Sequence, residues 1–208
     1  MKVSWKPGTM VYPVPAALVS CGNTDETRNL ITVAWTGTLC TNPAMLYISV
    51  RPERYSYNII KEQREFALCL TTAAMARATD WCGVKSGRDT DKWSATGLTP
   101  LPGVKCGCLL IEESPLCIEC KVRDIVPLGS HDMFMADVVN VVADDRYLDP
   151  DTGRFDLAAS GLMAYSHGFY YRLGEQLGKF GFSVQRRKKA GAAKRKPPKS
   201  SNPKISED

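Results

Sequence analysis

The stretch SVRPERYSYNIIKEQREFALCL, residues 49–70, joins two apolar runs through a short polar segment. Its start completes a β-branched run at 45–50, and its end opens a second apolar run at 66–72. Between them, apolar and polar residues alternate as on an amphipathic helix, which we predict over 53–64. The stretch therefore predicts two strands connected by one helix, with two arginines and three hydroxyl side chains at the mouth of that helix.

Working outward, most of the remaining chain predicts strands rich in Val, Ile, Thr and Cys. Further helices are predicted at 73–78 and 167–180; in the latter, Phe169, Leu173, Leu177 and Phe180 recur at helical spacing and Gly181 stands as a C-terminal cap. Strand follows strand without βαβ alternation, so the pattern indicates a mainly β, antiparallel, barrel-like fold with a few peripheral helices. The predicted strands are 14–21, 29–35, 45–50, 66–72, 108–113, 116–126 and 133–142.

The formal net charge of +5 is concentrated at one end of the chain. Residues 186–208 contain nine Lys and Arg against two acids, which leaves 18 bases and 20 acids in the rest. That tail has few apolar residues, and we predict that it is disordered and that residues 1–185 form one domain. No aromatic residue interleaves with its charges, so solubilisation is favoured over nucleic-acid binding. Without an apolar span or a signal-peptide core, we expect a cytoplasmic protein and no membrane partner.

Eight cysteines raise the question of disulfides or a metal centre. The pairs CGC at 106–108 and CIEC at 117–120 resemble half-sites for zinc. However, Cys117 and Cys120 fall within one predicted strand, where residues three apart point to opposite faces. We therefore expect reduced, buried thiols and no metal.

Several catalytic motifs are missing from the sequence. There is no G-x-G-x-x-G after a strand and no P-loop signature, so Rossmann-type and P-loop nucleotide sites are disfavoured. With His131 and His167 as the two histidines and no nucleophile elbow, nothing positions a catalytic triad. His131 is either a turn residue bonded to nearby backbone or a donor at the rim of a pocket.

The mouth of the helix at 53–64 is a candidate anion site. Ser56 can cap the helix, whose exposed N–H groups and positive dipole end favour a phosphate. Arg51 and Arg54 flank it, and guanidinium suits phosphate oxygens. The alternative is that Arg54 forms a surface ion pair with Glu53 or Glu62. Upstream, Trp35, Thr36 and Gly37 could contact a planar ligand, although a tryptophan is more often simply core.

Four segments, taken together, resemble the flavin reductase-like, FMN-binding split-barrel family and, within it, the flavoredoxin group. They span nearly all of residues 9–185 and are NLITVAWTGTLCTNPAMLYISVRPERYSYNIIKEQREFALCLTT, DWCGVKSGRDTDKW, GSHDMFMADVVNV and AYSHGFYYRLGEQLGKFGFSV. The resemblance implies a homodimeric split β-barrel that holds one noncovalent FMN near the subunit interface.

The resemblance also implies which residues contact the FMN. Asn29, Trp35, Thr36 and Gly37 match the segment that contacts the isoalloxazine and neighbouring groups. The other matching positions are Arg51 and Ser56 on the phosphate side, Thr71 and Thr72 at the end of the next strand, and Lys92 and His131, which approach the flavin. A cation near the N1–O2 edge of the flavin would stabilise its reduced form, which suits Lys92. From the residues alone, a solvated loop lysine is the favoured interpretation of Lys92.

The expected activity is that of an FMN-dependent oxidoreductase, with the flavin rather than a protein nucleophile carrying the chemistry. Electrons would come from NAD(P)H or a protein donor and pass to an acceptor that the sequence does not identify. The alternative is an electron-carrier flavoprotein, as in the flavoredoxin group, with little NAD(P)H activity of its own.

Overall fold

The computed structural model of the chain describes residues 1–184, so the tail predicted at 186–208 lies outside the described residues. Its contacts form one compact unit, Met1–Leu173, and a second that begins at Gly174 and contains the single turn η3 (Phe182–Val184). The domain boundary at 185 stays a prediction. In the described part of the chain, no helix is both long and apolar enough to cross a membrane.

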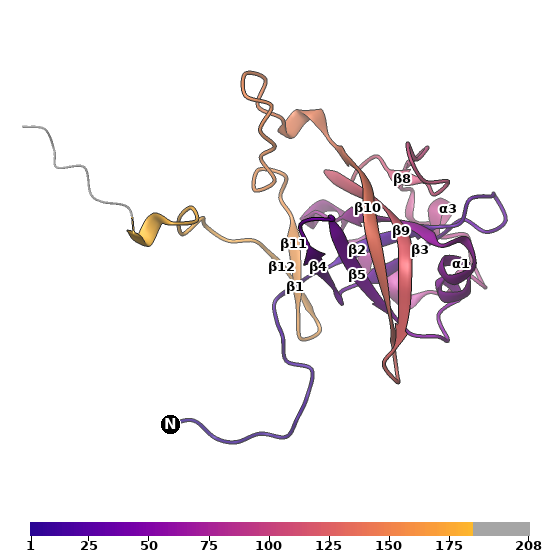
Figure 1. The fold of residues 1–208 in the computed structure, drawn as a ribbon, viewed down its shortest axis with the longest axis horizontal. Helices are drawn as coiled ribbons and strands as arrows, with labels where there is room; N and C mark the ends of the chain where they lie inside the picture. The colour runs from indigo at the N-terminus through magenta and orange to yellow at the C-terminus, as the bar shows by residue number, and fades with distance from the viewer. Residues whose placement is uncertain (185–208) are drawn as a thin grey trace, which may run out of the picture. The chain divides into compact units, whose positions relative to one another are not determined.

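A seven-stranded antiparallel sheet forms the body of the first unit, as predicted (Figure 1). Two twelve-residue strands, β9 and β10, run side by side as its longest pair. The predicted strands at 45–50, 116–126 and 133–142 match β5, β9 and β10 to within one residue at each end. In sheet order the strands are β3 (Asn29–Val33), β2 (Ala17–Cys21), β6 (Glu65–Leu70), β9 (Leu116–Pro127), β10 (Asp132–Ala143), β5 (Met45–Val50) and β4 (Thr36–Cys40).

The sheet curls because its two edge strands are consecutive in the chain. Only Ala34 and Trp35 separate the end of β3 from the start of β4, so opposite edges of a seven-stranded sheet must meet there. The backbone N–H of Ser49 in β5 donates to the Trp35 carbonyl at 2.8 Å and ties the crossing to β5. The result is the split barrel expected from the sequence, with Trp35 at its seam.

Alternate residues of the strands supply two separate cores. Val19 and Ile31 belong to the core inside the barrel, whereas their neighbours Leu18 and Leu30 belong to a second core outside it. This alternation follows from the two-residue period of a strand. It also places the Cys120 side chain in the first core and that of Cys117 in the second, so the prediction of opposite faces is confirmed.

Helices cover the barrel at two places. Helix α1 (Tyr55–Gln63) lies within the predicted 53–64, packs Tyr57 and Ile60 into the barrel core and ends at Arg64 with a left-handed φ of 57°. The predicted helix at 73–78 becomes a turn, η1 (Ala73–Met75), followed by α2 (Ala76–Val84). With α3 (Lys92–Thr96), which the sequence reading missed, α2 covers the second core through Cys82 and Trp93.

The helix predicted at 167–180 is wrong. Residues in this region form a hairpin of β11 (Met163–Ser166) and β12 (Phe169–Arg172), and β1 (Val14–Pro15) pairs with β11 to make a three-stranded sheet. The linking residues His167 and Gly168 both have positive φ, 49° and 93°. A two-residue turn with positive φ at both positions fits the twist of a hairpin, and it overrides the helical spacing of Phe169 and Leu173.

Three short elements complete the first unit. The predicted strand at 108–113 shrinks to β8 (Leu110–Ile111), which pairs with β7 (Pro100–Leu101). A single turn, η2 (Asp145–Tyr147), follows β10.

A buried carboxylate fixes the loop before β8. Glu119 of β9 is fully buried, and its Oε1 accepts hydrogen bonds from the backbone N–H groups of Val104, Lys105 and Cys106 at 2.8, 2.8 and 2.9 Å. Its Oε2 accepts from Asn140 Nδ2 at 2.6 Å. Burial alone raises the pKa of Glu119, but these four donors outweigh it and the pKa lies below its ordinary value.

We predict that Glu119→Ala lowers the free energy of unfolding by about 3 kcal/mol, because it strands several buried donors. Glu119→Gln should cost less, since the Asn140 amide can turn its oxygen toward the new side chain. Because the pKa of Glu119 is lower in the folded state, its ionised carboxylate stabilises the fold above the unfolded pKa of about 4.3. This stabilisation is lost as the pH falls through the folded pKa. Urea unfolding at pH 7 and pH 3 should therefore show the wild type losing its advantage over Glu119→Gln at low pH. An advantage that is equal at both pH values would contradict this account.

Candidate functional site

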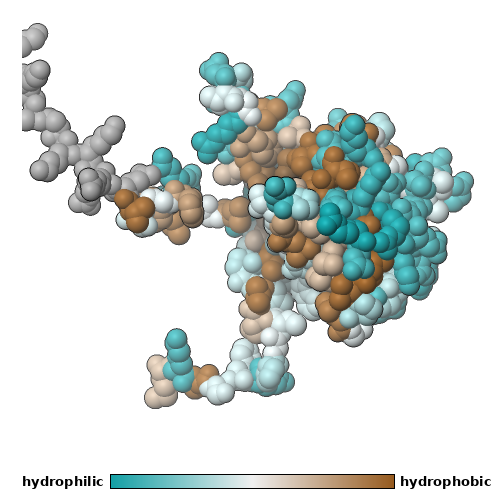
Figure 2. All heavy atoms as spheres, in the orientation of Figure 1, coloured by the Kyte–Doolittle hydropathy of each residue, from teal (hydrophilic) through white to brown (hydrophobic). Residues whose placement is uncertain are grey.

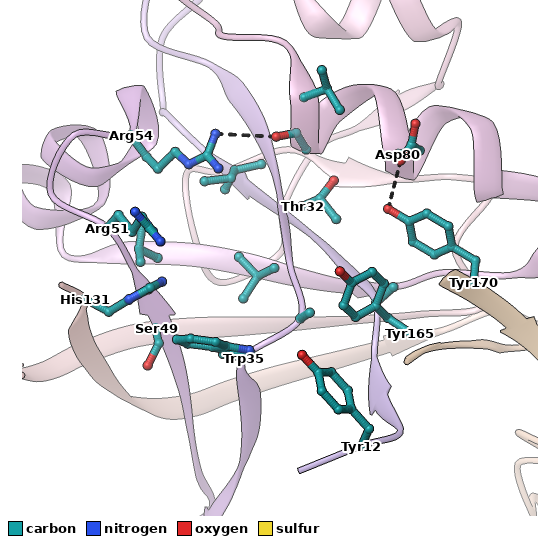
Figure 3. A pocket seen from close by; sticks show the side chains of 17 residues that line it. Tyr12, Thr32, Trp35, Ser49, Arg51, Arg54, Asp80, His131, Tyr165 and Tyr170 are labelled. Carbon is teal, nitrogen blue, oxygen red and sulfur yellow. Dashed lines mark hydrogen bonds between the residues drawn. The ribbon is translucent and has the colours of Figure 1, made fainter. Parts of the chain in front are cut away.

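A cavity of about 450 Å³ opens at the seam of the barrel. Its walls come from β3, the Ala34–Trp35 crossing, the end of β5, helix α2 and the β11–β12 hairpin. Figure 3 shows arginines and His131 pointing into this space from one side and three tyrosines from the other. We call it the main cavity; its labelled side chains include Tyr12, Trp35, Arg51, Arg54, His131 and Tyr170.

A second cavity of about 250 Å³ adjoins the main cavity, and Ile31, Arg51 and Arg54 line both. We call this second space the cationic end, because five basic residues surround it and Glu53 is the acidic residue among its described lining. A ligand that spans both cavities would contact aromatic rings at its end in the main cavity and basic residues at its other end. The five basic residues are Arg51, Arg54, Lys85, Arg88 and Lys92.

Arg51 and Arg54 lie at the junction of the two cavities, and the ion pair predicted there from the sequence involves a different arginine. It is Arg51, not Arg54, that pairs with Glu53, at 3.3 Å, and both partners are more than half exposed. An exposed pair of this kind contributes little to stability and can be exchanged for a ligand. Arg54 instead donates from Nη1 to the Gly83 carbonyl at 3.4 Å, which draws its guanidinium across the junction.

Ser56 lies at the start of α1 but does not cap it, so that prediction is wrong. The cap position is Arg54, whose side chain makes no capping bond, and Ser56 is the second residue of the helix. Its hydroxyl is buried and accepts from Asn29 Nδ2 at 2.8 Å. Because the cap position lies two residues earlier than the pattern suggested, Ser56 faces the cationic end together with Asn29 rather than bonding its own helix.

Lys92 is buried, so its interpretation as a solvated loop lysine is wrong. Only 4% of the residue is exposed, and its Nζ donates to the Cys82 carbonyl at 2.7 Å. Asp91 caps α3 by accepting from the N–H of Trp93 at 3.0 Å, which turns Lys92 inward. Burial lowers the pKa of Lys92, and the charge of Arg54 lowers it further. An ammonium has three donors, so an anionic or carbonyl-bearing ligand could accept a further hydrogen bond from Lys92.

The loop between α2 and α3 approaches the cationic end so closely that it requires glycine. A Cβ on Gly87 would stand 2.4 Å from Asn29 Oδ1 and 2.7 Å from Tyr55 Cδ1. The loop therefore holds Asn29 and the first residue of α1 in place by contact, and its neighbours Ser86 and Arg88 line the same space. Glycine has no Cβ and therefore permits this close packing of loop against strand and helix.

Trp35 and His131 form one wall of the main cavity. Their ring centroids lie 4.4 Å apart with the planes tilted by 36°, and Trp35 is 36% exposed rather than core. Ser130 Oγ contacts His131 Nδ1 at 3.0 Å. Burial lowers the pKa of His131, and the charge of Arg51 adds to this, so a neutral ring is favoured at neutral pH. His131 is a turn residue bonded to nearby backbone, because its carbonyl accepts from the Leu128 N–H, and its ring also lines the cavity; its role as a donor to a ligand stays a prediction.

One buried hydrogen bond connects helix α1 to the strand that follows His131. Tyr57 in α1 donates to the Asp132 carboxylate at the start of β10, at 2.5 Å. Asp132 follows His131 directly, so this bond fixes the imidazole relative to the helix that begins beside Arg54. Both partners are at least nine-tenths buried, which makes the connection costly to break.

The three-stranded sheet adds residues that sequence reasoning missed. Tyr165 and Tyr170 of the β11–β12 hairpin and Tyr12 before β1 line the main cavity. Tyr170 donates to Asp80 of α2 at 3.2 Å, and burial together with Asp80 raises the pKa of Tyr170 to about 12. The run AYSHGFYYR, with aromatic residues around a His-Gly turn, carried the signal for this hairpin and was interpreted as a helix.

Four of the expected site residues lie outside the two cavities. The Thr71 hydroxyl donates to the Ala16 carbonyl, and Thr72 lines a different cavity beside α2. Thr36 donates to the Tyr47 carbonyl at 2.5 Å and lines an adjoining apolar space, while Gly37 packs against the Tyr47 ring. The structure thus brings together six of them: Asn29, Trp35, Arg51, Ser56, Lys92 and His131.

Comparison with known proteins gives consistent matches. A protein family described as the flavin reductase like domain matches residues 9–174. The flavoredoxin of Desulfovibrio vulgaris (Miyazaki F) is 30% identical, with a TM-score of 0.81 over 89% of this chain and 100% of that one. A flavoredoxin from Methanosarcina acetivorans matches with a TM-score of 0.79 at 23% identity over 89% of this chain and 100% of that one. An NADPH-flavin oxidoreductase of Streptomyces viridifaciens is 25% identical over 64% of this chain and 68% of its own.

Proposed function

This chain belongs to the flavin reductase-like family, and we propose that it binds one FMN and passes electrons through it from NAD(P)H or a protein donor to an acceptor. Family membership supports a flavin-related oxidoreductase. The choice of FMN, the electron donor and the acceptor are our proposal. The observation that carries it is the pair of adjoining cavities, the aromatic main cavity and the cationic end, which share Ile31, Arg51 and Arg54, because FMN has a planar aromatic ring at one end and a phosphate at the other.

The residues fit such a cofactor. Cavities of about 300–1,000 Å³ are typical of small-molecule sites, and the main cavity alone measures about 450 Å³. Its aromatic side chains suit the isoalloxazine, and an apolar body with few polar groups is the usual lining of a cofactor site. Gly87 lets the loop between α2 and α3 pack directly against Asn29 and Tyr55, which positions two residues of the cationic end.

The phosphate would lie at the junction, where Arg51 and Arg54 line both cavities and α1 begins. The first N–H groups of a helix and its positive dipole end attract a phosphate, and guanidinium can bind it through two donors. Arg51 is held by an exposed pair with Glu53 that a phosphate can displace at little cost.

Lys92 and Asn29 form the buried polar wall of the cationic end, so with the phosphate at the junction they would lie on the phosphate side of the cofactor. FMN supplies hydride and single-electron chemistry, and its reduced form carries additional negative charge. A buried ammonium near the cofactor favours the added charge, and low local polarity strengthens the effect. His131, neutral and stacked on Trp35, helps to exclude water from the main cavity and holds its Nδ1 at Ser130.

A pure electron carrier is the second candidate function. The 30% identity and TM-score of 0.81 with a flavoredoxin favour it. A carrier would exchange electrons with redox proteins and react slowly with nicotinamide nucleotides, although it would hold the same FMN.

We also propose a homodimer in the cytoplasm. Figure 2 shows hydrophobic residues exposed among hydrophilic ones on the barrel, and exposed apolar side chains include Leu39 of the edge strand β4 and Val141 of β10. Such side chains suit an interface between copies. Light scattering on the purified protein measures its mass, and a monomer would overturn the dimer. Nucleic-acid binding by the tail remains unsupported.

We predict that Lys92→Gln lowers the midpoint potential of bound FMN by about 30–60 mV, the equivalent of about 1.4–2.8 kcal/mol in a two-electron couple. Lys61→Gln is the matched control, because it removes an equal charge from α1 at an exposed position outside both cavities. Spectroelectrochemical titration gives the potentials. A Lys92→Gln protein that binds FMN with the wild-type potential would refute this role.

The two functions are separated by mixing the FMN-loaded protein with NADH or NADPH without oxygen and following the flavin absorbance in a stopped-flow instrument. A reductase bleaches within seconds with at least one nucleotide. Absence of fast bleaching with both, in a protein that dithionite reduces fully, leaves the electron carrier. A protein that binds no flavin at all would overturn both.

A further inference from the structure

A third cavity, of about 280 Å³, adjoins the main cavity on the side of the N-terminal segment. We call it the annex. Tyr12, Ala34 and Trp35 line both spaces, so a molecule in the annex would share walls with one in the main cavity. Besides these, the annex is lined by Thr9, Val11, Val14, Thr36 and Tyr47.

The wall that divides the two spaces is held firmly. The Trp35 carbonyl accepts from the N–H of Ser49 at 2.8 Å, and the indole stacks on His131 at a centroid distance of 4.4 Å. Thr36, the next residue, is fixed by its bond to the Tyr47 carbonyl. The Trp35–Thr36 wall of the annex therefore belongs to the same seam as the main cavity, and the N-terminal segment supplies the opposite wall.

The charge of the annex contrasts with that of its neighbours. All eight of its described lining residues are uncharged, whereas Arg51, Arg54 and Asp80 line the main cavity. An anion or cation in the annex would lose hydration without gaining a partner, which is costly. A neutral molecule does not carry that penalty.

The volume and the lining of the annex indicate what kind of neutral molecule fits it. The space is below the usual range for drug-sized ligands, so it suits one or two rings. Three aromatic side chains, Tyr12, Trp35 and Tyr47, favour a flat aromatic body through edge and face contacts. The Thr36 hydroxyl donates its hydrogen bond to the Tyr47 carbonyl. The Thr36 Oγ1 can therefore still accept a hydrogen bond from a ligand hydroxyl.

We infer that the annex binds a small, uncharged aromatic molecule of one or two rings that carries a hydroxyl group. This goes beyond the proposed function, because it concerns a second ligand beside the FMN space and holds whether or not the protein reduces flavin with NAD(P)H.

The test uses the full chain as purified, with 2-naphthol as the probe and naphthalene-2-sulfonate as its charged counterpart of similar shape. Methyl-labelled NMR should show saturable shifts at Val11, Val14 and Ala34 with 2-naphthol. The sulfonate should leave the Val11 and Val14 methyls unshifted. Separately, the flavin spectrum of the same sample reports the FMN proposal, so failure of one does not mimic failure of the other.

Val11→Glu places a carboxylate at the exposed rim of the annex and should weaken 2-naphthol binding by about tenfold. Val3→Glu, at an exposed position of the same N-terminal segment outside the described cavities, is the matched control and should bind as the wild type does. Shifts confined to Val50 and Val84 of the main cavity, equal binding of the sulfonate at the annex methyls, equal loss in both variants, or no saturation would each overturn the inference.

Discussion

The rest of the structure depends on how the sheet closes. Two residues, Ala34 and Trp35, connect strands that lie at opposite edges of a seven-stranded sheet, so the sheet must curl until those edges meet. The bond from Ser49 to the Trp35 carbonyl locks this seam. A seam cannot be filled by regular pairing, and the space left there becomes the cavity between the barrel, α2 and the small sheet. The position of Trp35 against His131 is a consequence of closure.

Local pattern predicted the fold well where contacts are short in range or repeat with the strand period. The strand at 45–50 and the opposite faces of Cys117 and Cys120 follow from alternation alone. The helix at 167–180 failed because Phe169 and Leu173 fit a helical spacing equally well, and a His-Gly turn decides the matter through backbone twist. Tertiary pairing with β1 then completes the sheet.

The candidate site was predicted less evenly, because it depends on contacts between distant segments. Nothing near Lys92 in the sequence indicates that its ammonium will donate a hydrogen bond to the Cys82 carbonyl or that the residue will be buried. The role of Ser56 changed from cap to partner of Asn29 for the same reason. What could be predicted was the gathering of Arg51 and Arg54 at a helix start. Together these groups create a cavity that runs from aromatic to cationic, an arrangement suited to a ring joined to a phosphate.

That arrangement is tested most directly by comparing the affinity of the protein for FMN and for riboflavin, which has the same ring but no phosphate. Fluorescence titration of the flavin-free protein measures both dissociation constants. Two charge-assisted contacts from the junction arginines predict that FMN binds at least about a hundredfold more tightly at low salt. Arg54→Gln should reduce that preference and leave riboflavin binding unchanged. Equal affinity for the two flavins, or no binding of either, would contradict the account.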